Sequence, residues 1–302
     1  MNQTKKKNPL KRLLSMRGMG QVVTVTIGLI VLLVAFALIN PNFWSPTNRT
    51  NLLRQIAPIL IIGIAQSYVL ITGNIDLSIG SVVGMSTMVA ATLMSKGIMS
   101  PIPALLVTLL CCLLIGVLNG LLVAKFKLPP FIATLGTMTV ARGIAQLVNG
   151  NYNTDSIMKF YPEAAQTFKN VFYYGKTLGL YNGIWIAIIL WIVFNFLLSK
   201  TRTGRYIYAT GSNIDAARLS GVNVVSTTVI AYVVSAFCSF VVGIITCATV
   251  GQGTMDAGNS YEMYAVAASV IGGVSTLGGQ GILLGTVVGA AIWGTLQNGL
   301  QF

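Results

Sequence analysis

An uncharged stretch near the start of the chain, residues 21–39, reads QVVTVTIGLIVLLVAFALI. As an α-helix with a rise of 1.5 Å per residue it extends about 28 Å, close to the thickness of the hydrocarbon core of a bilayer. Cleavable secretory signals have shorter apolar cores and small-residue cleavage sites, whereas this run is followed by NPNFW at residues 40–44. The stretch therefore predicts a first transmembrane helix that is retained.

The composition extends this prediction to the whole chain. Of the 302 residues, 54% are hydrophobic and 8% are charged, against roughly 25% charged in soluble domains. The 32 glycines are scattered, as is usual where membrane helices approach closely. No Gly/Ser-rich linker or charge run divides the sequence. We therefore expect an all-α membrane protein, with one polytopic helical domain over residues 1–302 embedded in a lipid bilayer.

Apolar runs that alternate with polar breaks predict nine spans. The segments are residues 21–39, 55–72, 77–94, 103–123, 131–148, 183–198, 226–249, 262–274 and 282–301.

The net charge of +13 does not indicate nucleic-acid binding, because the basic residues follow the expected topology. If the N-terminus is cytoplasmic, twelve basic residues lie inside: six in the tail 1–20, two at Lys125 and Lys127, and four in 200–223. Six lie outside, three of them in the long loop 149–182, where charge constrains orientation less than in short loops. The distribution predicts a cytoplasmic N-terminus.

Several kinds of chemistry are not expected. The chain has no histidine, which excludes imidazole metal ligands and histidine-dependent catalysis. Its cysteines lie in apolar runs without zinc spacing, and we expect them to be small buried hydrophobic residues. They are Cys111, Cys112, Cys238 and Cys247. No nucleophile–base pair is visible. The sequence therefore predicts neither an enzyme nor a metal site.

Residues 200–223, KTRTGRYIYATGSNIDAARLSGVN, form a basic loop between two apolar runs. Asn213 is a candidate N-cap, Asp215 favours a first helical turn, and Gly221 favours a C-terminal stop. A short capped helix in such a loop indicates a docking element for a cytoplasmic protein. The alternative is an amphipathic helix that lies on the membrane.

A polar break, TGNIDLSIGS at residues 72–81, separates two apolar runs. Polar backbone at membrane depth is tolerated where it faces protein or a water-filled path, and an intramembrane carboxylate is a functional candidate. Asp76 is therefore a candidate for the lining of a path. The alternative is that Asp76 caps the third helix through backbone amides.

Two threonines and one arginine lie in the fifth predicted span. Thr134 and Thr137 share a helix face and could line a polar path, although threonines in apolar helices more often bond their own helix carbonyls. Arg142 is expected to snorkel or to pair with another helix.

Two further features are a glycine cluster between the last two predicted spans and an aromatic loop. The glycine cluster at 272–281, GGVSTLGGQG, lacks the Gly-Lys-Ser/Thr ending of a phosphate-binding loop, so we reject nucleotide binding there. The aromatic loop 149–182 is expected to anchor the membrane interface, and the alternative is a docking surface for an extracytoplasmic partner.

Four motifs in order resemble the ribose-type sugar permeases of ATP-binding cassette importers. They are the break around NIDLS at 74–78, FIATLGT at 131–137 with a following Arg-Gly, the loop 200–223, and the Glu262-led helix with its paired-glycine loop. The resemblance extends from about residue 42 to 302. Asn74 replaces the family's usual glycine, and Tyr264 replaces a usual acid or amide. The family usually has ten spans, one more than the nine predicted here.

The resemblance implies a membrane subunit in a bacterial inner membrane, without a cofactor of its own because ATP binds a partner. It implies three partners: a cytoplasmic ATPase, an extracytoplasmic sugar-binding protein and a second permease subunit in a homodimer or heterodimer. The implied ATPase contact comprises Asn213, Asp215, Ala216, Ala217, Arg218, Leu219 and Gly221. The implied translocation path comprises Asn74, Asp76, Ser78, Ser81, Thr134 and Thr137.

The expected cargo is a small sugar such as ribose, xylose or galactose. A polyol-like signal molecule, a nucleoside or a branched-chain amino acid is the alternative within the class. An ion-coupled secondary transporter is a further alternative, but proton coupling usually needs titratable groups within the bundle. Only Asp76 and Glu262 qualify.

Overall fold

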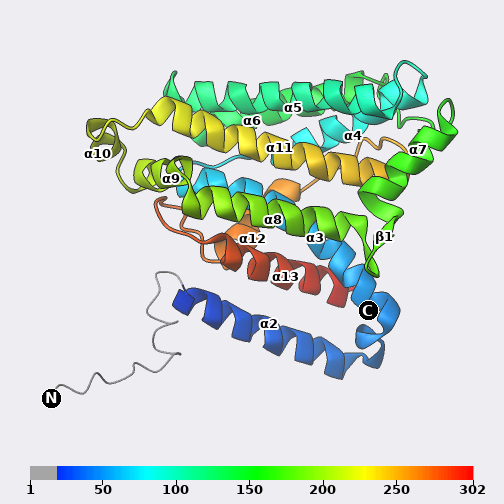
Figure 1. Cartoon of the computed structure of the whole chain (residues 1–302), viewed down its shortest axis with the longest axis horizontal. Coiled ribbons are helices and arrows are strands. Elements are labelled where there is room, and N and C mark those ends of the chain that lie inside the picture. The colour runs from blue at the N-terminus through cyan, green and yellow to red at the C-terminus, as the bar shows by residue number, and fades with distance from the viewer. Residues whose placement is uncertain (1–18, 302) are drawn as a thin grey trace.

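The computed structural model describes residues 19–301. Most of the predicted tail 1–20 lies outside this range. Long helices run side by side along the horizontal direction of Figure 1, with α10 at one end and α7 at the other. The helices that fall in the predicted spans are α2 (Met19–Ile39), α3 (Pro46–Ile71), α4 (Ile79–Ser95), α5 (Pro101–Ala124), α6 (Pro130–Leu147), α8 (Asn182–Lys200), α11 (Val224–Val250), α12 (Tyr261–Ile271) and α13 (Leu283–Gly299).

Shorter elements occupy the two ends of this bundle (Figure 1). At the α10 end lie α9 (Arg202–Ser212) and α10 (Ile214–Leu219). The opposite end, the α7 end, carries η1 (Pro41–Trp44), α7 (Pro162–Lys169), the π-helical turn η2 (Asn170–Tyr174) and a two-stranded antiparallel hairpin of β1 (Lys176–Thr177) and β2 (Leu180–Tyr181).

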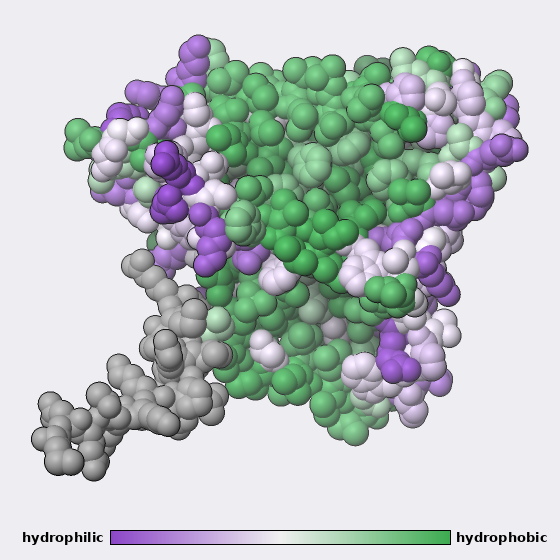
Figure 2. Space-filling model, viewed as in Figure 1, coloured by the Kyte–Doolittle hydropathy of each residue, from purple (hydrophilic) through white to green (hydrophobic). Residues whose placement is uncertain are grey.

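The surface confirms an all-α membrane protein. Apolar side chains cover the middle of the face shown in Figure 2, and hydrophilic residues gather at both ends. By length and composition, five helices of the described chain are apolar enough to cross a membrane: α2, α3, α5, α8 and α11. Helix α12 has only 11 residues, about 16 Å of helix, which is too short to cross alone. The count of nine spans therefore stays a prediction.

Helix α3 forms the centre of the bundle, with buried residues all round its C-terminal half. A helix that is apolar on every side belongs in a core. It packs against α8, α11, α12 and α13. Small residues permit the close approach: a Cβ at Gly63 would lie 2.9 Å from Thr286 Cγ2 and 3.2 Å from Ala268 Cβ.

Three of the four cysteines are buried as expected, and Cys111 is only partly buried. All four are free, and Cys112, Cys238 and Cys247 are buried within helices. Among the described residues no group of three or more metal-ligating side chains occurs.

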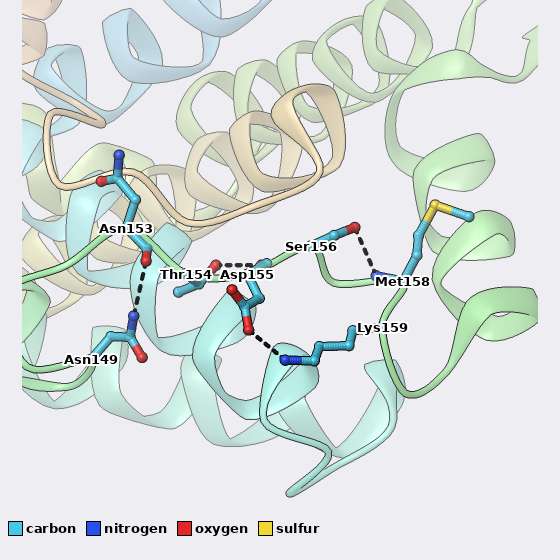
Figure 3. Close-up of polar contacts among 7 residues, drawn as sticks. All are labelled: Asn149, Asn153, Thr154, Asp155, Ser156, Met158 and Lys159. Atoms are coloured by element: carbon cyan, nitrogen blue, oxygen red, sulfur yellow. Dashed lines mark hydrogen bonds and ion pairs between the residues drawn. The ribbon is translucent and has the colours of Figure 1, made fainter.

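At the α7 end, loop 149–159 joins the segment that follows α11. Thr154 N donates to Gly253 O at 2.9 Å, and Gly253 N donates to Thr154 Oγ1 at 2.8 Å. Figure 3 shows the loop's internal contacts, including the 2.7 Å ion pair between Lys159 and Asp155. The hydrogen bond from Lys159 and its positive charge lower the pKa of Asp155.

Aromatic side chains of the same end hold Arg54. Its guanidinium lies 4.3 Å from the ring centre of Tyr173 and 4.2 Å from that of Tyr181. This stacking attaches the η2–β2 region to the start of α3. Part of the aromatic loop therefore packs against the bundle, and its predicted interface role stays untested.

Candidate functional site

The backbone leaves helical geometry between α3 and α4, as the polar break predicted. Helix α3 ends at Ile71, Gly73 has φ +78°, and α4 begins at Ile79. Only residues with little steric restriction adopt such a positive φ easily, and glycine is the usual one. The intervening Asp76 and Ser78 are 3% and 1% exposed. The part of the break around Asp76 and Ser78 therefore lies inside the protein, whereas Gly73 is exposed.

Asp76 is held by uncharged donors. Its Oδ1 accepts hydrogen bonds from Ser78 N at 2.9 Å and Ser78 Oγ at 2.6 Å, and its Oδ2 accepts one from Ser235 Oγ at 2.7 Å. The capping alternative is only half right. Asp76 binds a backbone amide two residues ahead, as in an Asx-turn, but the N-cap of α4 is Ser78, whose side chain makes no capping bond.

The hydrogen bonds continue across three more helices. Asn119 of α5 donates from Nδ2 to Ser78 Oγ at 2.9 Å, and Thr137 of α6 donates to Asn119 Oδ1 at 2.6 Å. Ser235 belongs to α11. We call Asp76, Ser78, Asn119, Thr137 and Ser235 the polar network. It links the break to α5, α6 and α11 through side chains that are all at most 3% exposed.

Two members of the polar network, Asn119 and Ser235, were not predicted. The sequence offered only weak signs of them: Asn119 is the one amide in the apolar run 103–123, and Ser235 is a serine in the run 226–249. Neither residue has a motif, and their pairing with the break depends on how distant helices are rotated against each other.

Three predicted path residues stay outside the polar network. Thr134 donates to Pro130 O of its own helix at 2.8 Å, as the alternative for threonines foresaw. Asn74 Nδ2 donates to Thr72 Oγ1 at 2.8 Å. The Ser81 hydroxyl is buried and makes no hydrogen bond among the described residues.

A second irregular segment, residues 251–260, approaches α4. Arg142 donates from Nη1 to Met255 O at 3.1 Å and to Ala257 O at 2.9 Å. Arg142 therefore does pair inside the protein, but with backbone carbonyls of an irregular segment and not, as was predicted, with another helix. A Cβ at Gly84 would lie 2.6 Å from Ala257 O, so glycine permits the approach. Two non-helical segments therefore flank α4 inside the bundle, a pattern typical of transporter sites.

The predicted cap of the loop helix is present at the α10 end. Asn213 Oδ1 accepts a hydrogen bond from Ala216 N at 2.8 Å, and Gly221 has φ +80° after α10. Asp215 lies in the first turn, 3.8 Å from Arg218, and both side chains are exposed. Such an exposed pair adds little stability.

The surface of α10 differs in one respect from the expected docking pair. Ala217 is 4% exposed and packs with Val222 and Val224, whereas Ala216 is exposed. Ala217 therefore holds α10 in place and offers almost no surface. Leu219 is 90% exposed and Ile214 is 46% exposed, so α10 offers two apolar side chains that a partner could contact.

Tyr208 connects α9 to the glycine cluster. Its hydroxyl donates to Gly281 O at 2.6 Å. Burial raises the pKa of Tyr208 to about 12, so the hydroxyl keeps its proton near neutral pH.

Comparisons with known proteins agree with this architecture. The family model described as "Branched-chain amino acid transport system / permease component" matches residues 48–302. A ribose import permease protein of Haemophilus influenzae is 40% identical over 278 residues, 91% of this chain and 84% of the relative. A ribose import permease protein of Bacillus subtilis is 36% identical, with 91% and 83% covered.

A galactose/methyl galactoside import permease protein of Escherichia coli is 33% identical over 290 residues, 90% of this chain and 85% of the relative. No solved structure matches the chain. Because one family model covers most of the chain and the relatives cover nine-tenths of it, the chain belongs to the family of branched-chain amino acid transport system permease components.

Proposed function

We propose that this chain is the membrane-spanning permease subunit of an ATP-binding cassette importer for a small sugar, in the inner membrane of a bacterium. The observation that carries the proposal is the identity of 33–40% to import permeases for ribose and galactosides over nine-tenths of the chain. The polar network suits such a cargo, because hydroxyl and amide groups can exchange hydrogen bonds with a neutral polyol without trapping a charge.

The proposed path runs beside the break and α4. Asp76, Ser78 and Thr137 belong to it through the polar network. Asn74, Ser81 and Thr134 remain proposed members that line its edge. The Ser81 hydroxyl is buried and makes no hydrogen bond among the described residues, so it has hydrogen-bonding capacity to spare.

ATP is proposed to bind a separate ATPase that docks on α10. The contact comprises Asn213, Asp215, Ala216, Arg218, Leu219 and Gly221, with Ala217 as internal support. An extracytoplasmic sugar-binding protein and a second permease subunit complete the proposed importer. These partners follow from the kind of relative matched and from the exposed apolar end of α10.

Uptake of labelled cargo tests the proposal. The chain is expressed with its ATPase and binding protein in cells that lack their own ribose permease. We expect ATP-dependent uptake of one labelled sugar from a panel of ribose, xylose, galactose and allose. Leucine, a nucleoside and a polyol serve as competing cargoes. Uptake that persists without the ATPase and collapses with the ion gradient would instead identify a secondary transporter.

A further inference from the structure

Three segments meet at the α10 end with their backbones in direct contact. They are the end of α3 (71–73), the end of α9 (208–212) and the glycine loop (277–281). Gly279 N donates to Ile71 O at 2.8 Å, which satisfies a carbonyl that the end of α3 leaves free. Tyr208 bonds the same loop through Gly281 O. We call this meeting point the glycine junction.

Glycine is required at the junction for steric reasons. A Cβ at Gly211 would overlap the carbonyl oxygen of Ile71 and lie 2.6 Å from Gly279 N. A Cβ at Gly278 would lie 2.8 Å from both Gly211 O and Gly73 Cα. All these neighbours are backbone atoms, which cannot swing aside as a side chain can. The three segments therefore move together or must separate.

The junction lies between the two functional features of the molecule. Gly211 precedes Asn213, the N-cap of α10, by two residues. Gly73 precedes Asp76 of the polar network by three. A displacement of α10 therefore reaches Asp76 through a few residues of backbone and one layer of backbone contact.

Space beside the junction permits such a displacement. A cavity of about 320 Å³ lies between α9 and the glycine loop, lined by Gln21, Tyr208, Ser212, Gly273 and Gln280 among others. Helix α9 is thus in tight contact with the end of α3 on one side and borders open space on another. It can shift toward the cavity without compressing the core.

We propose that Gly211 and Gly278 are positioning residues that transmit movement of the ATPase-docking helix α10 to the polar break at Asp76. This inference rests on the proposed function, because it assumes that an ATPase moves α10. It adds a specific route: α10, the end of α9, the glycine junction, and the residues that follow α3.

The test is the number of sugar molecules imported per ATP hydrolysed by the whole complex in proteoliposomes. Gly211→Ala separates the three segments but leaves the exposed surface of α10 intact. We expect the ATPase to copurify and hydrolyse ATP, while the ratio falls about tenfold, as expected when a typical coupling between sites is lost. Gly289→Ala is the matched control, because its Cβ would overlap Ala268 O in a contact between α12 and α13. The control should lower the melting temperature but keep the ratio.

A milder pair of variants covers the case in which Gly211→Ala does not fold. Tyr208→Phe removes one hydrogen bond to the glycine loop, and Tyr174→Phe removes a similar bond to Thr249 O at the α7 end. We expect a lower ratio for Tyr208→Phe only.

Equal ratios of sugar imported to ATP hydrolysed for Tyr208→Phe, Tyr174→Phe and wild type would overturn the proposed role of the glycine junction. An equal fall of this ratio in Gly211→Ala and Gly289→Ala would overturn it too. If the wild-type complex itself imports no sugar at the expense of ATP, the proposed function fails. If the wild type couples normally and only the variants behave alike, the function stands and the junction alone is wrong.

Discussion

Asp76 is a buried carboxylate whose hydrogen-bond donors are all uncharged: the amide and hydroxyl of Ser78 and the hydroxyl of Ser235. The Asp76 carboxyl group has no cationic partner within salt-bridge distance among residues 19–301, so these hydrogen bonds are what compensate its burial. Asp76 lies within the break and binds Ser78 two residues ahead. This indicates that it fixes the backbone between α3 and α4, so its effect on cargo is expected to be indirect.

Asp76→Asn tests this interpretation. The amide keeps the Asx-turn but replaces one of the two acceptor oxygens that bind Ser78 and Ser235 with an NH2 donor, so we expect a loss of about 1–3 kcal/mol in the free energy of unfolding, together with slower uptake and unchanged sugar preference. Asp155→Asn, at an exposed ion pair, is the control and should change neither the free energy of unfolding nor the rate of uptake. Normal melting with altered sugar preference would instead make Asp76 a direct ligand.

Asn119 carries the polar network from the break to α6. Asn119→Ala would leave the hydroxyls of Ser78 and Thr137 without this partner in a buried site, which costs about 1–3 kcal/mol. Thr108→Val in the same helix removes only a bond to the helix's own Ala104 O and should cost clearly less. Thermal unfolding of the purified variants measures both. If Asn119→Ala and Thr108→Val lowered the free energy of unfolding by similar amounts, the polar network would add no more stability than an ordinary bond within a helix.

Among the elements, α10 exposes two large apolar side chains, Leu219 at 90% and Ile214 at 46%, and keeps Ala217 for its own packing. We expect Leu219→Asp to abolish copurification of the ATPase and ATP-driven uptake without lowering the melting temperature. Arg218→Glu should weaken the same association, because the exposed pair of Arg218 with Asp215 adds little stability and Arg218 can pair with a carboxylate of a partner instead. Ala217→Trp should instead destabilise the segment. Leu178→Asp, equally exposed in the hairpin at the α7 end, is the control. Normal ATPase binding by both Leu219→Asp and Arg218→Glu would contradict the assignment of α10.

The elements also show how far sequence reasoning reaches. Each predicted span contains a helix, and the cap at Asn213 was predicted, because apolar periodicity and capping are local signals. The polar residues 251–260 were predicted as a break, and the span predicted at 262–274 was already short; α12 ends at Ile271, before the glycine pair at 272–273. Asn119 and Ser235 were missed, because a hydrogen bond between helices depends on packing between segments more than 40 residues apart.

For the whole molecule, orientation remains to be measured. The described loops carry six basic residues at the predicted inner end and six at the outer end, so they alone do not decide it. The predicted orientation therefore depends on the six basic residues of the tail, and on the rule that basic residues in a long loop such as 149–182 constrain orientation less than those in short loops. If the tail faces the cytoplasm, α10 does too, and the ATPase can reach Leu219.

Cysteine labelling in intact cells measures this orientation. Leu178 and Leu219 are 87% and 90% exposed at opposite ends of the bundle, and the native cysteines, except partly buried Cys111, are buried. In a Cys111→Ser background, a membrane-impermeant maleimide should label Leu178→Cys in intact cells, and Leu219→Cys only after permeabilisation. The unmodified background should remain unlabelled in both conditions. The reverse pattern would place α10 outside the cell, where no ATP-hydrolysing partner could dock, and would remove the basis for both the coupling helix and the glycine junction.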